Sequence, residues 1–208
     1  MPDRTHSLSA LLVLLAVGLG AGCTHTAMLP ARQLAAGETV ASLGVDAPGL
    51  GVLPRGHGQL TVGTGGGDVS VNVGASAYLD VGVAGRYYLH EGLTAEAQLR
   101  TMVGFEAPLS PVTGIVGLQG VPTDDHPFYF GGHVGGVSGS DLRFSPPDEE
   151  ETRVTYPIVG ASVGFGRVDL GNDWHLQVEA AGNIPLGAPD DAPLPPARLS
   201  VGVFHSFR

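Results

Sequence analysis

The 208-residue chain has ten basic and 20 acidic residues, which gives a formal net charge of −10. Nucleic acid is therefore excluded as a partner, because binding to phosphates requires a basic surface. The chain is 43% hydrophobic, yet after Cys23 no apolar run is long enough for a membrane-spanning helix. This combination is typical of a transmembrane β-barrel, in which apolar and polar residues alternate.

Residues 1–22 have the order of a signal peptide. Arg4 lies in a short polar start, the apolar run Leu8–Leu19 follows, and the small residues Gly20–Gly22 come before Cys23. A charged start, an apolar centre and small residues at the cleavage site are the three parts of an export signal. The chain is therefore predicted to be exported and cleaved before Cys23.

Cys23 is the only cysteine of the chain, so it cannot form an internal disulfide. The stretch Leu19–Cys23 resembles a lipobox, whose cysteine becomes the acylated N-terminus of a bacterial lipoprotein, although Gly20 stands where leucine is preferred. The alternative is an ordinary export signal followed by a chance cysteine. The resemblance implies that Cys23 carries the lipid, that residues 23–37 form a polar tether, and that Thr24 is compatible with sorting to the outer membrane.

Residues 38–208 are predicted to form one all-β domain, because apolar residues recur there with the period of two that β-strands show. Ten strands are predicted, at residues 38–46, 57–64, 68–76, 78–89, 93–105, 112–120, 127–137, 153–168, 173–183 and 197–207. In the third, Val69, Val71 and Val73 share one face while Ser70 and Asn72 share the other. A soluble β-sandwich shows the same alternation, so this pattern alone leaves both architectures open.

The connections between the predicted strands favour a barrel. Even-numbered connections such as Gly65–Gly67 are short, odd-numbered ones such as 138–152 are mostly long, and only the third, around Ala77, departs from this order. Outer-membrane barrels have short periplasmic turns and longer external loops. On this basis an aromatic girdle is predicted on the apolar face near the periplasmic strand ends, made of Tyr87, Phe128, Phe165, Trp174 and Phe207.

The last strand alternates from Leu199 to Phe207 and resembles the terminal strand of outer-membrane proteins, although Arg208 follows and His205 interrupts the apolar face. The pattern of the mature chain resembles small OmpA-like barrels. That resemblance implies an antiparallel up-and-down barrel of about ten strands, eight to twelve, in the outer membrane. It also implies help from barrel-assembly and lipoprotein-sorting machinery, but no specific ligand.

The polar face of the strands is predicted to line the barrel lumen with paired charges, because buried charges require partners. This ladder comprises Asp80, Arg86, Glu96, Arg100, His133, His175, Glu179 and Arg198. Asp68 and several glutamines, including Gln59, Gln119 and Gln177, share that face. The many glycines there, such as Gly160 and Gly164, leave a narrow pore or a small-ligand cavity open as the alternative.

No residue pattern predicts catalysis, a cofactor or a metal. His205 and Ser206 are adjacent, so on a strand they point to opposite faces. His175 and Glu179 share a face but are about 13 Å apart at the rise of a strand. The acidic runs Asp124–Asp125 and Asp148–Glu151 are interpreted as solvated loop charges.

The leading hypothesis is a lipid-anchored outer-membrane barrel with a structural or surface-interaction role. A periplasmic sandwich or lipocalin-like lipoprotein that binds an apolar ligand is the first alternative, and a lipid-modifying barrel enzyme is the second.

Overall fold

The computed structural model describes residues 28–48, 54–75, 79–103, 112–121, 127–140, 153–187 and 197–207. The predicted signal peptide, Cys23 and the acidic runs at 124–125 and 148–151 lie outside this part of the chain. Among the described residues, no helix is long and apolar enough to cross a membrane.

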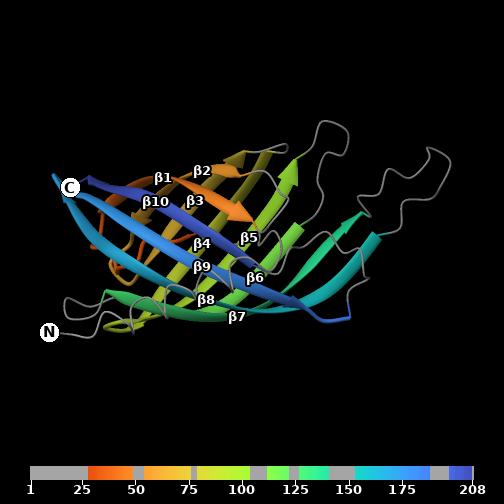
Figure 1. The fold of residues 1–208 in the computed structure, drawn as a ribbon. Coiled ribbons are helices and arrows are strands. Elements are labelled where there is room, and N and C mark those ends of the chain that lie inside the picture. Colours follow the sequence, from red (N-terminus) through yellow and green to blue (C-terminus); the bar gives the residue numbers. More distant parts are fainter. Residues whose placement is uncertain are drawn as a thin grey trace, which may run out of the picture.

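Ten antiparallel strands form a closed barrel, in which each strand pairs with its neighbours in sequence and β1 pairs with β10 (Figure 1). Both the all-β class and the number of strands predicted from the sequence are confirmed, and the sandwich alternative is wrong. The strands are β1 (Thr39–Pro48), β2 (Arg55–Gly63), β3 (Gly67–Ala75), β4 (Leu79–His90), β5 (Leu93–Val103), β6 (Val112–Gly120), β7 (Phe128–Ser140), β8 (Arg153–Gly171), β9 (Trp174–Pro185) and β10 (Ala197–Phe207).

Strand β8 is longer than predicted. The sequence predicted residues 153–168, whereas the strand reaches Gly171 and spans 19 residues. Its pairing with β9 shifts register twice, between Phe165 and Val168 and between Asp169 and Gly171. Bulges of this kind interrupt the alternation of side chains while the strand continues, which is why the period of two failed to reveal its end.

The connections divide the barrel into two ends. We call the end at which β1 begins the turn end, since it carries the short connections at 64–66, 91–92, 121–127 and 172–173. Asn172 and Asp173 both have positive φ, at 54° and 62°, as a two-residue type I′ hairpin requires. The opposite end, the loop end, carries the longest connections, at 104–111, 141–152 and 186–196, together with the connection at 49–54 and the exception predicted near Ala77, at 76–78.

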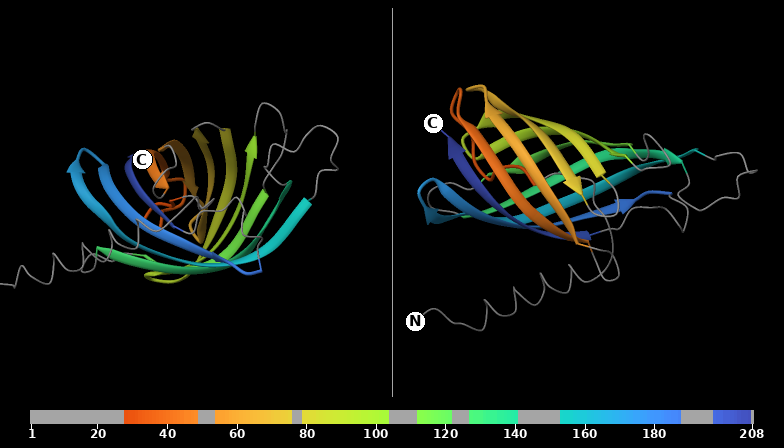
Figure 2. Two further views of the ribbon diagram at one scale, coloured as in Figure 1. Left: turned by 45° about the vertical axis from the view of Figure 1, so that its right-hand side comes forward. Right: turned by 90° about the horizontal axis from the view of Figure 1, so that it is seen from above.

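Residues Met28–Glu38, which we call the inner segment, enter the barrel at its turn end, with residues 28–34 inside and residues 35–37 exposed. The side chains of Met28, Leu29, Ala31 and Leu34 are all buried. Figure 2 shows the red-orange start of the described chain within the ring of strands. The sequence predicted residues 23–37 as a tether, and residues 28–34 of it occupy the lumen.

Candidate functional site: the barrel lumen

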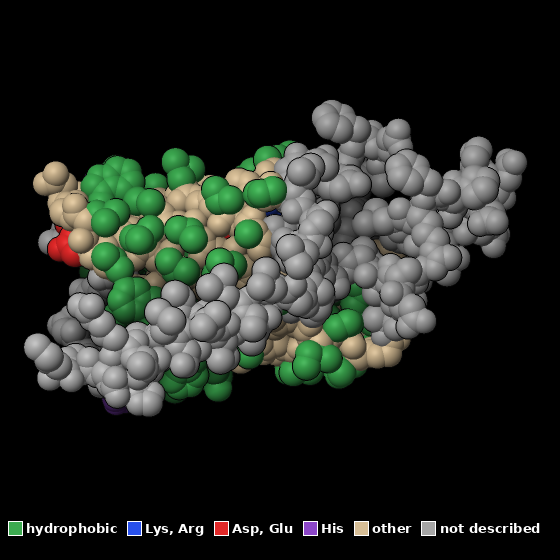
Figure 3. Space-filling model, viewed as in Figure 1, with side chains coloured by type: hydrophobic (Ala, Val, Ile, Leu, Met, Phe, Trp, Pro, Cys, Tyr) green, Lys and Arg blue, Asp and Glu red, His purple; other side chains and the backbone are tan. Residues whose placement is uncertain are grey.

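The two faces of the barrel wall have opposite polarity. Residues that alternate along one strand are buried or exposed in turn, so that Ser70 is 1% exposed and its neighbour Val71 is 56% exposed. The outward residues are mainly valine, leucine and phenylalanine, and Figure 3 shows hydrophobic side chains spread over the wall, with acidic ones at its turn end. The inward residues are mostly polar. A soluble barrel has the reverse arrangement, with its apolar side chains inside.

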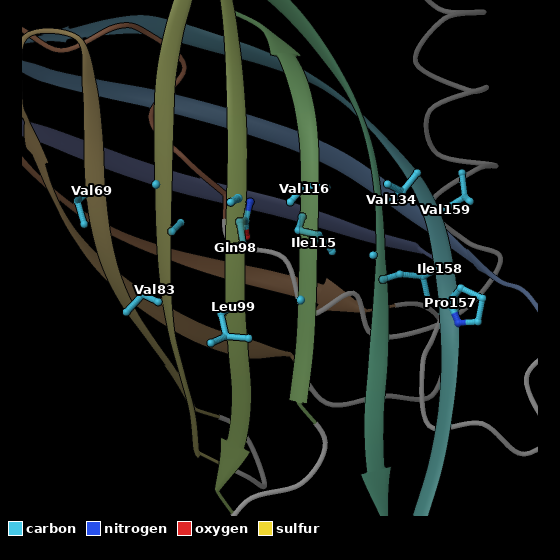
Figure 4. A pocket seen from close by; sticks show the side chains of 15 residues that line it. Val69, Val83, Gln98, Leu99, Ile115, Val116, Val134, Pro157, Ile158 and Val159 are labelled. Atoms are coloured by element: carbon cyan, nitrogen blue, oxygen red, sulfur yellow. The ribbon is translucent and has the colours of Figure 1, made fainter.

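The outer wall also has an apolar groove of about 750 Å³ across β3 to β8 (Figure 4). Outward side chains such as Val83, Leu99 and Val134 line it, and Gly85 and Gly114 lie between them. Gln98 also borders the groove, but its side chain is buried on the inward face of β5. The groove therefore offers apolar contact and no reactive group.

Charged side chains of five strands fill the lumen toward the loop end. Arg55 contacts Asp46 and lies 3.0 Å from Asp80, which also accepts a hydrogen bond of 2.5 Å from Nε of Arg100. His57 Nδ1 lies 3.2 Å from Asp46 Oδ1, and Arg198 lies 3.7 Å from the same atom. The acids and bases of this network alternate in space, so each buried carboxylate has a cation beside it.

Arg198 also pairs with Glu179, and this pair leads to a second network. Tyr129 donates a hydrogen bond of 2.9 Å to the other oxygen of Glu179, and Gln177 donates one of 2.8 Å to the Tyr129 hydroxyl. The Tyr129 ring has space because it lies against Gly164, where a Cβ atom would come within 2.4 Å of the ring. A glycine on one strand thus accommodates a large side chain from the next.

Near the turn end, Arg86 and Asp68 form a pair that is almost completely buried. Arg86 donates three hydrogen bonds to the Asp68 carboxylate, at 2.6 to 3.1 Å, and the Tyr88 hydroxyl donates another at 2.6 Å. The sequence placed Asp68 on the lumen face but not in the predicted ladder. Its partner was recoverable, because Asp68 and Arg86 are directly opposite in the register of β3 and β4.

These wall residues also hold the inner segment. Gln177 accepts a hydrogen bond from the Ala31 amide and donates one to the Leu29 carbonyl, at 2.9 and 2.8 Å. Arg86 donates to the carbonyls of Pro30 and Arg32, at 2.6 and 3.0 Å.

Further contacts of the segment involve Tyr88 of β4, Ser206 of β10 and Glu38 of the segment itself. The Leu34 amide donates to the Tyr88 hydroxyl at 2.7 Å. Arg32 pairs with Glu38 within the segment at 2.6 Å and donates to Ser206 at 2.7 Å. The space left between the segment and β9 and β10 is about 20 Å³, room for about one water molecule. This half of the lumen is closed.

Every member of the predicted ladder lies on an inward position of its strand. Arg86, Arg100 and Arg198 have the acidic partners described above, and Asp80 and Glu179 are among those partners. His133 contacts Asn183 at 2.5 Å instead of an acid. Glu96 and His175 are half-buried on β5 and β9. The eight residues of the predicted ladder pair with one another only in part. The other charged partners are Asp46, Arg55, His57 and Asp68, which were not in that ladder.

The predicted girdle residues all face outward near the turn end. Tyr87, Phe128, Trp174 and Phe207 are exposed, and Phe165 is half-buried beside Phe128, with ring centres 5.0 Å apart. His205 lies between the rings of Trp174 and Phe207, each with its centre 4.5 Å away. The polar interruption of the last strand is therefore covered by aromatic neighbours. That this belt meets a membrane interface stays a prediction.

The structure separates the two adjacent side chains that the sequence analysis considered for catalysis. His205 faces outward and Ser206 is buried on the inward face, in line with their adjacent positions on β10. Within the part of the chain that the structure describes, no group of three or more histidine, cysteine or acidic residues could hold a metal ion.

No protein-family model matches the chain, and no curated protein matches it in sequence. Among solved structures, the N-terminal β-barrel domain of Pseudomonas aeruginosa OprF is similar over 84% of this chain and 100% of that domain, with 9% identity and a TM-score of 0.36. The NanC porin is similar over 82% of this chain and 99% of its own, with 14% identity and a TM-score of 0.43. At these values, neither similarity indicates what this chain does.

Proposed function

We propose that the protein is a lipid-anchored outer-membrane β-barrel with a closed lumen and a structural or surface-interaction role. One observation carries the proposal: the barrel is closed, apolar outside and polar inside. In a bilayer every backbone group must be hydrogen-bonded within the protein, and a closed barrel meets this demand without a free strand edge. An apolar exterior in water would expose far more hydrophobic surface than a soluble protein tolerates.

The lipid anchor rests on Cys23, which lies outside the described residues. Several acyl chains on this cysteine would bind a bilayer stably. The barrel would supply an independent attachment. The two attachments predict that removal of the cysteine alone leaves the protein in the membrane.

The contents of the lumen argue against a conducting pore. The inner segment and the charged networks of β1 to β5, β9 and β10 occupy it, and the space beside the segment holds about one water molecule. A lipocalin-like carrier would require an apolar cavity inside the barrel, whereas the lumen residues named above are mainly charged. A lipid-modifying enzyme would require a nucleophile and a base on the outer face, and the groove across β3 to β8 has neither among its lining residues.

Electrophoretic mobility with and without boiling in detergent, followed by membrane fractionation of a Cys23→Ala variant, tests the proposal. We expect unboiled protein to migrate differently from boiled protein, because a folded barrel stays compact in detergent. We expect the Cys23→Ala variant to stay in the membrane fraction. A variant that is released into buffer, with no mobility shift, would overturn the membrane barrel. Altered lipid composition in a strain that lacks the protein would favour the enzyme.

A further inference from the structure

The barrel wall contacts the inner segment mainly through the segment's main chain. Gln177, Arg86 and Tyr88 make five hydrogen bonds to backbone atoms of residues 29, 30, 31, 32 and 34. The carboxamide of Gln177 bonds the Leu29 carbonyl and the Ala31 amide, on either side of Pro30. One residue of a neighbouring parallel strand would make the same two bonds. The wall thus recognises an extended backbone.

Each of these wall residues has a second partner on the wall itself. Arg86 retains its three hydrogen bonds to Asp68, and Tyr88 retains its bond to the same carboxylate. Gln177 retains its bond to the Tyr129 hydroxyl. Because these side chains are fixed by the barrel, their positions do not depend on the segment. A site whose groups are already oriented binds its ligand with a smaller loss of conformational freedom.

The segment is joined to β1 by a turn that can serve as a hinge. Glu38 N–H donates to the Ala35 carbonyl at 3.1 Å, and Gly37 lies between them with a φ of 78°. This is the third position of a type II turn, which requires positive φ and therefore favours glycine. Arg32 and Glu38 pair across the turn at 2.6 Å, so the main ionic contact of the segment is internal.

We propose that the turn-end half of the lumen is a binding site for an extended peptide, and that the chain's own residues 28–34 are its bound ligand. The ligand class is a peptide main chain with small or apolar side chains, because Met28, Leu29, Ala31 and Leu34 are buried against the wall. Gly202 sets a further limit, since a Cβ atom there would come 2.4 Å from the Met28 side chain. A peptide of the same kind exchanges with the inner segment.

Peptide binding to a full-length variant tests this proposal directly. In the variant, residues 28–34 are replaced by seven glycine and serine residues, so the chain keeps its length while the site loses its ligand. The probe is a fluorescein-labelled synthetic peptide with the sequence of residues 28–36, measured by anisotropy on detergent-solubilised protein. We expect saturable binding to the variant, and at least about tenfold weaker apparent binding to the unaltered chain, whose tethered segment competes at a high effective concentration.

Methylation of single backbone amides in the probe shows whether the main chain is recognised. N-methylation at Ala31 or at Leu34 removes the amide donor that bonds Gln177 or Tyr88. We expect each of these two peptides to bind up to about tenfold more weakly than the unmethylated probe. N-methylation at Gln33 is the matched control, because the hydrogen bond of this residue to His90 comes from its side chain. Equal binding of all three peptides, or no binding to a variant that retains the heat-dependent mobility shift, would overturn the proposal.

Thiol labelling keeps the proposal testable if the replaced variant fails to fold. Ala31→Cys in a Cys23→Ser background gives one buried thiol in the full chain. We expect Gln177→Leu to speed its reaction with a water-soluble maleimide about tenfold or more, and Gln59→Leu to leave the rate within about twofold. Gln59 is also a buried lumen glutamine, but it bonds Thr61 and Ser70 of the wall. If the thiol reacts at the same rate in both variants, the inner segment is a permanent part of the barrel core and not an exchangeable ligand.

The tests of this proposal are separate from those of the proposed function. Peptide binding and thiol labelling are measured in detergent, so they report on the lumen wherever the protein resides. Fractionation and the Cys23→Ala variant report on the membrane and leave the lumen untouched. A barrel that fails to remain in membranes can still bind the peptide, and a membrane barrel can still hold its segment permanently.

Discussion

The inner and outer faces of this barrel wall are made from alternate residues of the same ten strands, yet they differ in what they demand of a side chain. On the outer face, positions such as Val71 and Leu43 are more than half exposed and contact few protein atoms. On the inner face, Arg86 and Asp68 each need one particular partner. The outer face therefore specifies only polarity, whereas the inner face specifies identity, size and charge.

The largest effect is expected from breaking an inner ion pair. Arg198→Met leaves Glu179 and Asp46, each 3% exposed, without this cation. Removal of one partner from a buried pair destabilises by about 3–5 kcal/mol. Urea unfolding of the protein in lipid vesicles measures the loss. The double variant Arg198→Met with Glu179→Gln should recover part of it. A loss below about 1 kcal/mol, as for a surface pair, would show that water reaches these charges.

A charge placed on the outer face comes next. Val71→Arg puts a cation at the middle of β3, and at the centre of a bilayer this costs about 2–4 kcal/mol. The same substitution at Leu170, next to the β8–β9 hairpin, should cost at most about 1 kcal/mol because it lies near the turn end. The two variants are compared by urea unfolding in vesicles. Equal, small losses of stability in the two variants would mean that the outer face is in contact with water. The apolar exterior and polar interior would then need another explanation.

The difference between the faces also explains what the sequence could predict. Alternation along strands such as 68–76 assigned each residue to a face, and the barrel has the predicted number of strands. Alternation did not decide whether the apolar face was a core or an exterior. That depends on closure between β1 and β10, a contact between the first and the last strand. The period of two carries no information about such a contact.

The position of the inner segment could not be predicted for a related reason. Residues 28–37 have neither strand alternation nor a helical period, so their pattern is that of a tether. Their place is determined by groups far along the chain, such as Gln177, which bonds residues more than 140 positions earlier. The partners Asp46, Arg55 and His57 were missed because a charge near a strand end gives no sign of which strand it faces across the lumen.

Glycines give a third, smaller contrast between the faces. At Gly164, on the inner face, a Cβ atom would come within 2.4 Å of the Tyr129 ring, whereas at Gly132, on the outer face, the nearest atom is 4.0 Å away. We expect Gly164→Ala to destabilise the barrel by about 1–3 kcal/mol, as overpacking does, and Gly132→Ala to change stability by at most about 0.5 kcal/mol. Unfolding midpoints of the two variants measure the difference. Equal midpoints would mean that Tyr129 moves aside without losing its bonds to Glu179 and Gln177.

The smallest effect is expected at the aromatic belt, a part of the outer face where side chains have particular partners. Trp174 stacks on His205 with ring centres 4.5 Å apart and an angle of 25° between the rings. Trp174→Leu keeps the position apolar and removes the stack, which should cost about 0.5–1.5 kcal/mol in vesicles. Phe130→Leu is the control. Phe130 is also an outward aromatic residue, 73% exposed, but it has no ring neighbour among the described residues. If the two substitutions cost the same, the belt specifies only polarity like the rest of the outer face. If Trp174→Leu costs more in vesicles but not in detergent micelles, the bilayer interface itself contributes, because that is where an amphipathic indole ring is favoured.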